Sequence, residues 1–149
     1  MTRDEALELL HSHLANKNLI KHCLSVEACM RALAARLGND PESWGLAGIL
    51  HDLDYEVTDK SPELHTTETV KVLREKGIAE PVIHAVQAHA GKVPCESPMD
   101  WAIFAVDPLT GLVISATLMH PAKKLKAIDL EFLTIAITAM QGIDQELGL

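Results

Sequence analysis

The chain has 149 residues, of which 48% are hydrophobic and 23% charged, and its formal net charge at pH 7 is −8. This length predicts one domain covering residues 1–149, and the composition is that of an ordinary globular protein. The acidic balance argues against a nucleic acid polymer as partner and against attraction to an anionic membrane surface. Aromatic residues are few (3%), and alanine and leucine are abundant, so the expected fold class is all-α.

Cysteine usage and the N-terminus bear on the compartment. The cysteines are odd in number and include no CxxC pair, so a disulfide framework is not expected: Cys23, Cys29 and Cys95. The first residues contain no apolar segment of the kind that a signal peptide needs. Both features predict a protein of the reducing cytoplasm.

The first two helices are predicted from caps and apolar periodicity. Residues 2–5 have the spacing of a capping box and open a helix. A second helix is expected from about residue 18 to residue 37, with Gly38 as its stop. His22 lies on the apolar stripe of this helix and is therefore predicted to face the core.

The third helix leads to a His-Asp doublet. Asp40 is its expected cap and Pro41 its first residue, and the helix continues to residues 51–52. Gly45 and Gly48 lie within it, where a glycine costs about 1 kcal/mol relative to alanine. We therefore expect another group to approach the helix closely at these glycines.

Two further helices each supply a histidine. The fourth is predicted to begin at residues 61–63, with His65 in its first turn. The fifth is predicted to run over residues 82–90, with His89 on its apolar stripe. His84 points about 140° away from that stripe by the helical period, so we expect it to be exposed.

The segment 101–119 is nearly all apolar and approaches membrane-spanning length. Asp107, Pro108 and Gly111 interrupt its centre, so we expect a buried core helix and no membrane span. An unpaired buried carboxylate costs several kcal/mol. Asp107 should therefore face a cation, a metal or a set of hydrogen-bond donors. A final amphipathic helix is expected over residues 129–141.

The predicted inner faces bring together imidazoles and carboxylates from separate helices: His22, His51, Asp52, His89 and Asp107, with His65 from a helix terminus. Such side chains suit divalent first-row metals, and Mg²⁺ where oxygen ligands dominate. No single spacing among them is diagnostic, unlike a paired CxxC site. The joint pattern is more specific than any of its parts.

In this order, the residues resemble the signature of the HD-domain superfamily of metal-dependent phosphohydrolases. That signature is a histidine, a His-Asp doublet on the next helix and a distant aspartate, and it matches His22, the doublet at 51–52 and Asp107. Residues 51–56 and 105–112 look like the corresponding segments of small, single-domain HDIG-like members. The resemblance implies a compact bundle of about six to seven helices.

Carried over by position, the resemblance implies one divalent metal ion (Mn, Fe, Co, Ni, Zn or Mg) held by four side chains: His22, His51, Asp52 and Asp107. His65 and His89 look like the additional histidines of members that hold a second metal, with the doublet aspartate bridging. The chain departs from the richest signatures at Ala90, where those have a second consecutive histidine. It also has Asp54 where the HDIG variant has glycine.

A metal held in this way lowers the pKa of a bound water and polarises a phosphoryl oxygen. Asp52, as a ligand, and Asp54 or Glu56, as groups that orient the water or accept its proton, are the candidate catalytic residues. Lys92 is a candidate to bind the substrate phosphate. The expected function is hydrolysis of a phosphate mono- or diester in a nucleotide or another small phosphorylated substrate.

Two other functions stay open. Some members of the HD fold use the extended ligand set for di-iron oxygen chemistry, which would require His65 and His89 as true ligands. The other is a regulatory module that binds metal without turnover, since the short chain has no insertion to build a lid. The sequence makes no prediction of the oligomeric state, and it does not name the substrate.

Overall fold

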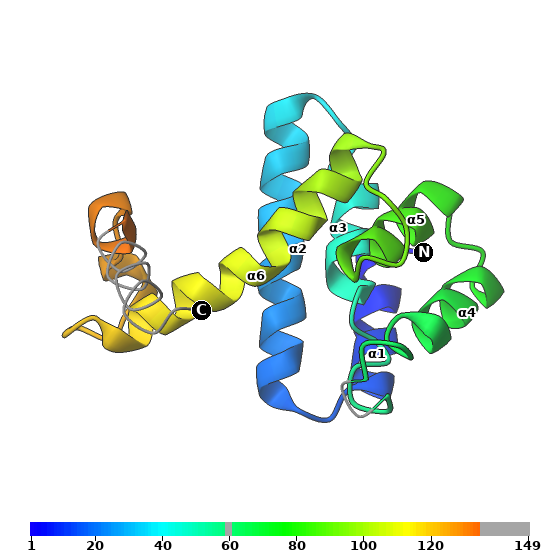
Figure 1. Ribbon diagram of the computed structural model, residues 1–149, viewed down its shortest axis with the longest axis horizontal. Coiled ribbons are helices and arrows are strands. Elements are labelled where there is room, and N and C mark those ends of the chain that lie inside the picture. The colour runs from blue at the N-terminus through cyan, green and yellow to red at the C-terminus, as the bar shows by residue number, and fades with distance from the viewer. Residues whose placement is uncertain (59–60, 135–149) are drawn as a thin grey trace, which may run out of the picture. The chain divides into compact units, whose positions relative to one another are not determined.

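The computed structural model describes residues 1–58 and 61–134, and all regular structure in these ranges is helical (Figure 1). The helices are α1 (Arg3–His13), α2 (Lys17–Leu37), α3 (Pro41–Leu50), α4 (Thr67–Glu75), α5 (Glu80–His89), α6 (Pro98–Met119) and the 3-10 helix η1 (Leu125–Ala127). The prediction of an all-α protein with six to seven helices is therefore confirmed for the described residues. Of the helix predicted over 129–141, residues 130–134 are helical and the remainder lies outside the described residues.

The chain divides into two compact units, one ending at Pro108 and the other beginning at Leu109, so the boundary falls inside α6. Every predicted metal ligand, from His22 to Asp107, belongs to the first unit. The single domain over residues 1–149 stays a prediction.

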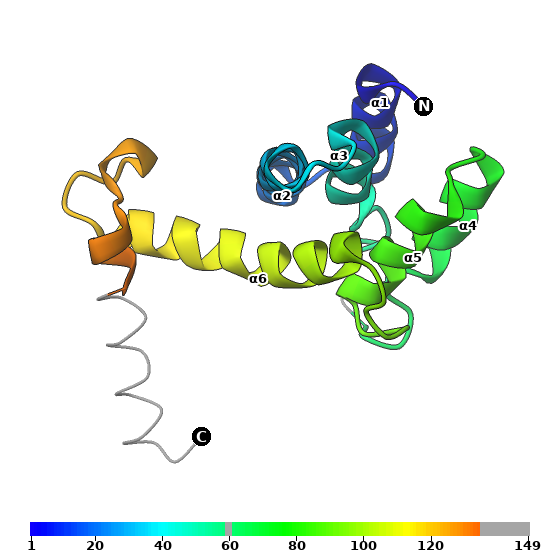
Figure 2. The same ribbon diagram turned by 90° about the horizontal axis from the view of Figure 1, so that it is seen from above.

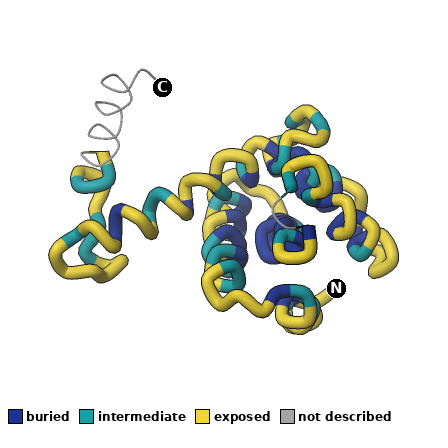
Figure 3. The backbone as a smooth tube through the Cα atoms, turned by 60° about the horizontal axis from the view of Figure 1, so that its bottom comes forward, coloured by how far each residue is buried: buried dark blue, intermediate teal, exposed yellow. Residues whose placement is uncertain are grey.

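Helix α3 forms the centre of the first unit. It packs against α1, α2 and α5, and Figure 2 shows it lying beside both α1 and α2. Its buried residues lie on all its sides: Trp44, Gly45, Ala47, Gly48, Ile49 and Leu50. A helix that is apolar all round is expected to be enclosed by its neighbours, and Figure 3 shows the burial concentrated in the interior of this unit. The His-Asp doublet directly follows α3, so both of its residues are buried next to the core.

Close contact with α2 explains the two glycines of α3. A Cβ atom on Gly48 would lie 2.8 Å from the Cα of Glu27, and one on Gly45 would lie 2.6 Å from the Cζ of Arg31. The predicted close approach is therefore confirmed. Glu27 is itself buried and binds the guanidinium groups of Arg3 and Arg31, each at 2.7–2.8 Å. This cluster of charges ties α1 to α2 next to the contact with α3.

We expect Gly48→Ala to destabilise the protein by about 1–3 kcal/mol. The added methyl group meets the backbone of Glu27, which cannot turn aside as a flexible side chain can. Urea unfolding measures the change in free energy. Gly111→Ala in α6 is the matched control, because a Cβ there meets nothing within 4 Å, and it should not destabilise. Wild-type stability of Gly48→Ala would contradict the close contact.

The prediction that α4 begins at residues 61–63 is wrong. The segment 62–66 forms turns and α4 begins after it, so His65 precedes the helix. The ammonium group of Lys92 donates to the carbonyl oxygens of Pro62 and Glu63 at 2.6 and 2.9 Å. These carbonyls thereby find a partner without a helix, which favours the turn conformation.

The prediction that residues 101–119 form a buried core helix is also wrong. By length and composition α6 is long and apolar enough to cross a membrane, and only 28% of its most apolar 18-residue stretch is buried. Ile103 is fully buried, whereas Trp101 and Phe104 are 60% and 47% exposed. The apolar residues lie all round the helix, while in the first unit the core covers one side of it. Helices of many proteins pass the same length test, so this finding by itself assigns no membrane role.

His84 is partly covered, which differs from the exposed position predicted for it. Its Nδ1 lies 3.0 Å from the Oδ2 of Asp100, a buried carboxylate. The same oxygen accepts hydrogen bonds from the backbone N–H groups of Glu96 and Ser97. His84 therefore ties α5 to the first turn of α6, a contact that helical phasing alone does not reveal.

Candidate metal centre

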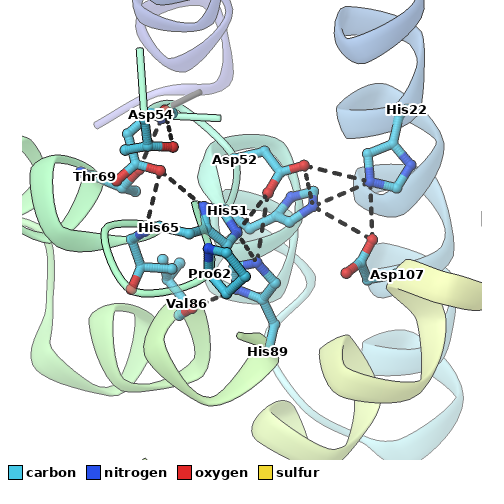
Figure 4. A network of polar contacts seen from close by, with 12 residues as sticks. His22, His51, Asp52, Asp54, Pro62, His65, Thr69, Val86, His89 and Asp107 are labelled. Carbon is cyan, nitrogen blue, oxygen red and sulfur yellow. Dashed lines mark hydrogen bonds and ion pairs between the residues drawn. The ribbon is translucent and has the colours of Figure 1, made fainter. Parts of the chain in front are cut away.

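The structure brings all the predicted metal-ligand side chains into one cluster (Figure 4). They come from five places in the first unit: His22 on α2, His51 and Asp52 directly after α3, His65 before α4, His89 at the end of α5 and Asp107 on α6. Two sets of three offer ligand atoms within 4.8 Å of one another: His22, His51 and Asp107, and His51, Asp52 and His89. The sets meet at the doublet.

One side of the cluster surrounds the Oδ2 atom of Asp52. This oxygen lies 3.7 Å from the Nε2 of His22 and 3.4 Å from the Nε2 of His51, and the two nitrogens are 3.3 Å apart. The Oδ1 of Asp107 lies 2.9 Å from His22 and 3.8 Å from His51. Ligand atoms about 2.1 Å from a tetrahedral metal lie about 3.4 Å from one another. The observed separations therefore fit one divalent ion.

The other side of the cluster surrounds the Oδ1 atom of Asp52. This oxygen lies 3.2 Å from the Nε2 of His65 and 3.5 Å from the Nε2 of His89. The two nitrogens are 3.1 Å apart. Asp52 thus directs one carboxylate oxygen to each side of the cluster, Oδ2 to that of His22 and His51 and Oδ1 to that of His65 and His89. Figure 4 shows it between the two sides.

Three of the four imidazole rings, those of His51, His65 and His89, are held from outside the cluster. Three Nδ1–H groups donate to acceptors there: His51 to the carbonyl of Gly48 at 2.8 Å, His89 to the carbonyl of Val86, and His65 to the carboxylate of Asp54 at 2.9 Å. In each ring the Nε2 atom then faces the cluster, where it can bind a metal once it has lost its proton. Such outer hydrogen bonds fix the tautomer and orientation of histidine ligands in metal sites.

The electrostatics keep the carboxylates ionised. Burial favours the neutral form of Asp52, but the charge of His51 and hydrogen bonds from His65 and His89 hold its pKa well below the usual range. Burial also opposes the charge on Asp107, yet hydrogen bonds from two histidines lower its pKa. Burial alone would lower the pKa of His65, but its carboxylate partners raise it to about 9. The carboxylates of Asp52 and Asp107 are therefore ionised and can attract a cation.

The other three predicted catalytic residues have contacts of different kinds. Asp54 holds His65 and the start of α4. Glu56 accepts hydrogen bonds from the backbone N–H groups of Ala15 and Asn16 at 2.6 and 3.0 Å, between α1 and α2. Lys92 holds the carbonyls before α4. These contacts support loops and helix starts, and the catalytic and phosphate-binding roles of the three residues stay predictions.

Fold and site together define a helical protein with a cluster of histidines and aspartates that could hold a metal ion. A match to the HD domain family covers residues 19–131. The chain belongs to this family, which is part of a superfamily of metal-dependent phosphohydrolases. The resemblance predicted from the sequence is thereby confirmed.

Curated relatives include larger proteins. The chain is 32% identical over 95 residues to Ribonuclease Y of Syntrophobacter fumaroxidans and 29% identical over 96 residues to Ribonuclease Y of Oleidesulfovibrio alaskensis. It is 30% identical over 95 residues to Ribonuclease Y 2 of Levilactobacillus brevis. Each match covers 64% of this chain and 18% of the relative. The shared part is therefore less than a fifth of each relative.

Proposed function

We propose that the protein is a metal-dependent phosphohydrolase that cleaves a phosphate mono- or diester in a nucleotide or another small phosphate ester. The observation that carries the proposal is the division of the Asp52 carboxylate, with Oδ1 facing His65 and His89 and Oδ2 facing His22 and His51. Two divalent metals that share a carboxylate form a recurrent centre for phosphoester hydrolysis. Membership of the HD domain family supports the same reaction class.

In this proposal the two positions differ in their ligands. The first takes four side chains: His22, His51, Asp52 and Asp107. The second takes three: Asp52, His65 and His89. The mixture of imidazole and carboxylate suits Mn, Fe, Co, Ni or Zn, and it suits Mg²⁺ less well because that ion prefers oxygen. When bound, the metals supply a water of lowered pKa and polarise a phosphoryl oxygen.

The fold holds the ligand side chains in place and leaves one edge of the cluster accessible to solvent. His22 and Asp107 have side chains that are 23% and 29% exposed, whereas those of Asp52 and His89 are 8% and 2% exposed. The substrate therefore approaches the edge formed by His22 and Asp107. Ligands that are already oriented need no rearrangement during the reaction, which favours catalysis.

The substrate is proposed to be small. The name of the relatives, ribonuclease, introduces RNA as a candidate substrate. A net charge of −8 opposes binding of a long polyanion, since binding of such polymers depends on many cationic contacts. A nucleotide or a short oligonucleotide presents the same phosphoester with far less repulsion. The proposed compartment is the cytoplasm, and all three cysteines are free thiols, as a reducing compartment requires.

A di-iron oxygenase is the second candidate function. The same observation favours it, since a shared carboxylate with several histidines also suits a pair of iron ions. It differs from the hydrolase in its product and in its need for O₂.

One experiment separates the candidates. The purified protein is analysed for metals and then assayed with Mn²⁺, Co²⁺ or Zn²⁺ on p-nitrophenyl phosphate, bis-p-nitrophenyl phosphate, nucleotides and short RNA. We expect two metals per chain and hydrolysis of a small phosphate ester that EDTA abolishes. Two irons with O₂-dependent turnover and no hydrolysis would establish the oxygenase instead. Firmly bound metal with no turnover on any substrate would point to a regulatory module and contradict the proposal.

A further inference from the structure

We propose that Asp54 is a positioning residue that builds the second half of the metal centre, because its carboxylate holds both His65 and the start of α4. The inference rests on the proposed function in that His65 is taken as a metal ligand. It extends that function by identifying Asp54 as the residue that orients His65 for metal binding. Asp54 itself stands behind His65 and does not face the metals.

The carboxylate of Asp54 is enclosed and fully used. Asp54 is 1% exposed. Its Oδ1 accepts hydrogen bonds from the Nδ1 of His65 at 2.9 Å and from the N–H of Thr66 at 3.1 Å. Its Oδ2 accepts from the N–H groups of Glu68 and Thr69, both at 3.1 Å. The N–H of Asp54 in turn donates to the Oγ1 of Thr69 at 3.1 Å. A carboxylate has about four acceptor positions, so these donors occupy them.

The start of α4 depends on this carboxylate. Thr66 is at the cap position, but its side chain makes no cap hydrogen bond and its φ is 72°, in the left-handed region. The first N–H groups of a helix need an acceptor from outside the helix, and a negative charge there is favourable for the helix dipole. Asp54 supplies both from 12 residues earlier in the chain.

His65 needs this support more than His51 and His89 do. His51 and His89 each donate their Nδ1–H to the carbonyl of the residue three positions earlier, within or at the end of a helix. His65 precedes its helix and receives a carboxylate partner in place of such a carbonyl. A carboxylate behind the ring fixes the tautomer and makes the imidazole a stronger ligand.

The same geometry argues against Asp54 as the group that takes the proton from water. Its oxygens are engaged on the Nδ1 side of the His65 ring, whereas the Nε2 of that ring faces Asp52. The segment after α3 thus supplies two different carboxylates. Asp52 faces both sides of the cluster, and Asp54, two residues later, orients the His65 ring toward it.

Asp54→Asn tests the inference, because it keeps the size of the side chain and replaces one acceptor oxygen with a donor. We expect affinity for the second metal to fall about 10–100-fold while the first metal is retained. Calorimetric titration with Mn²⁺ then shows two sites in the wild type and one strong site in the variant. Asp40→Asn is the matched control. It makes the same change in a carboxylate that caps α3 through Glu42 and Ser43, and it should leave both sites intact.

A measurement on the unmutated protein keeps the test independent of folding. In Zn²⁺-loaded protein with ¹⁵N-labelled histidines, the His65 ring should have its proton on Nδ1 and Zn²⁺ on Nε2. The opposite tautomer would overturn the inference, and so would Asp54→Asn binding two metals with wild-type affinity. A wild type that binds two metals yet hydrolyses no phosphoester defeats the proposed function and leaves the positioning by Asp54 in place.

Discussion

Asp52→Ala is expected to lose both metals and to lower the rate of phosphoester hydrolysis by at least about 1,000-fold, since metal activation is worth several kcal/mol. Asp52 has one carboxylate oxygen on each side of the centre, at 3.4 Å from His51 on one side and 3.2 Å from His65 on the other. Its removal takes a ligand and a negative charge from both positions. Elemental analysis and the rate with p-nitrophenyl phosphate measure the two losses.

The control for Asp52→Ala is the loss of a carboxylate elsewhere in the fold. Asp40→Ala removes the cap of α3 and should cost about 1 kcal/mol of stability without loss of metal. Circular dichroism shows whether both variants keep their helices. An Asp52→Ala protein that retained both metals and full activity would refute the assignment of the centre.

Much of the fold was predictable because its signals are local. The capping box of Thr2 and Glu5 is present at the start of α1. Asp40 accepts hydrogen bonds from the first turn of α3, and Gly38 ends α2 with a φ of 71°. Each of these features depends on residues within one turn of one another, so sequence spacing is sufficient to place them.

The start of α4 was not predictable because its determinants are distant. Its cap is Asp54, 12 residues before Thr66, and the turns before it are held by Lys92, 30 residues after Pro62. The spacing rules that favour Ser61 and Pro62 as a helix start consider only neighbouring residues and take no account of such distant contacts. The tertiary partners therefore override the local preference.

The candidate site likewise has features that local sequence signals predict and features that they do not. Helical phasing placed His22 and His89 on inner faces because apolar periodicity reveals which side of a helix is buried. Which oxygen of Asp52 faces which side of the centre depends on side-chain geometry, and apolar periodicity gives no information about that geometry. The positioning by Asp54 was missed because several of its donors are backbone N–H groups, and these have no identity in a sequence.

The two sides of the centre should respond differently to the loss of a ligand. Asp107→Asn removes a charged ligand from the exposed first position, and we expect the hydrolysis rate to fall at least about 1,000-fold. His89→Ala removes a ligand from the enclosed second position, and we expect one metal to remain with a smaller loss of rate. Metal content and turnover, measured on the same samples, separate the two variants.

The difference follows from access. A phosphate ester and a water molecule must reach the metal that activates them, and the side chain of Asp107 is 29% exposed whereas that of His89 is 2% exposed. We therefore expect the first position to do the chemistry and the second to contribute charge and to hold Asp52 in place. If His89→Ala proved the more damaging of the two variants while one metal remained bound, the enclosed position would be the reactive one. The substrate would then have to enter beside His65, whose side chain is 14% exposed.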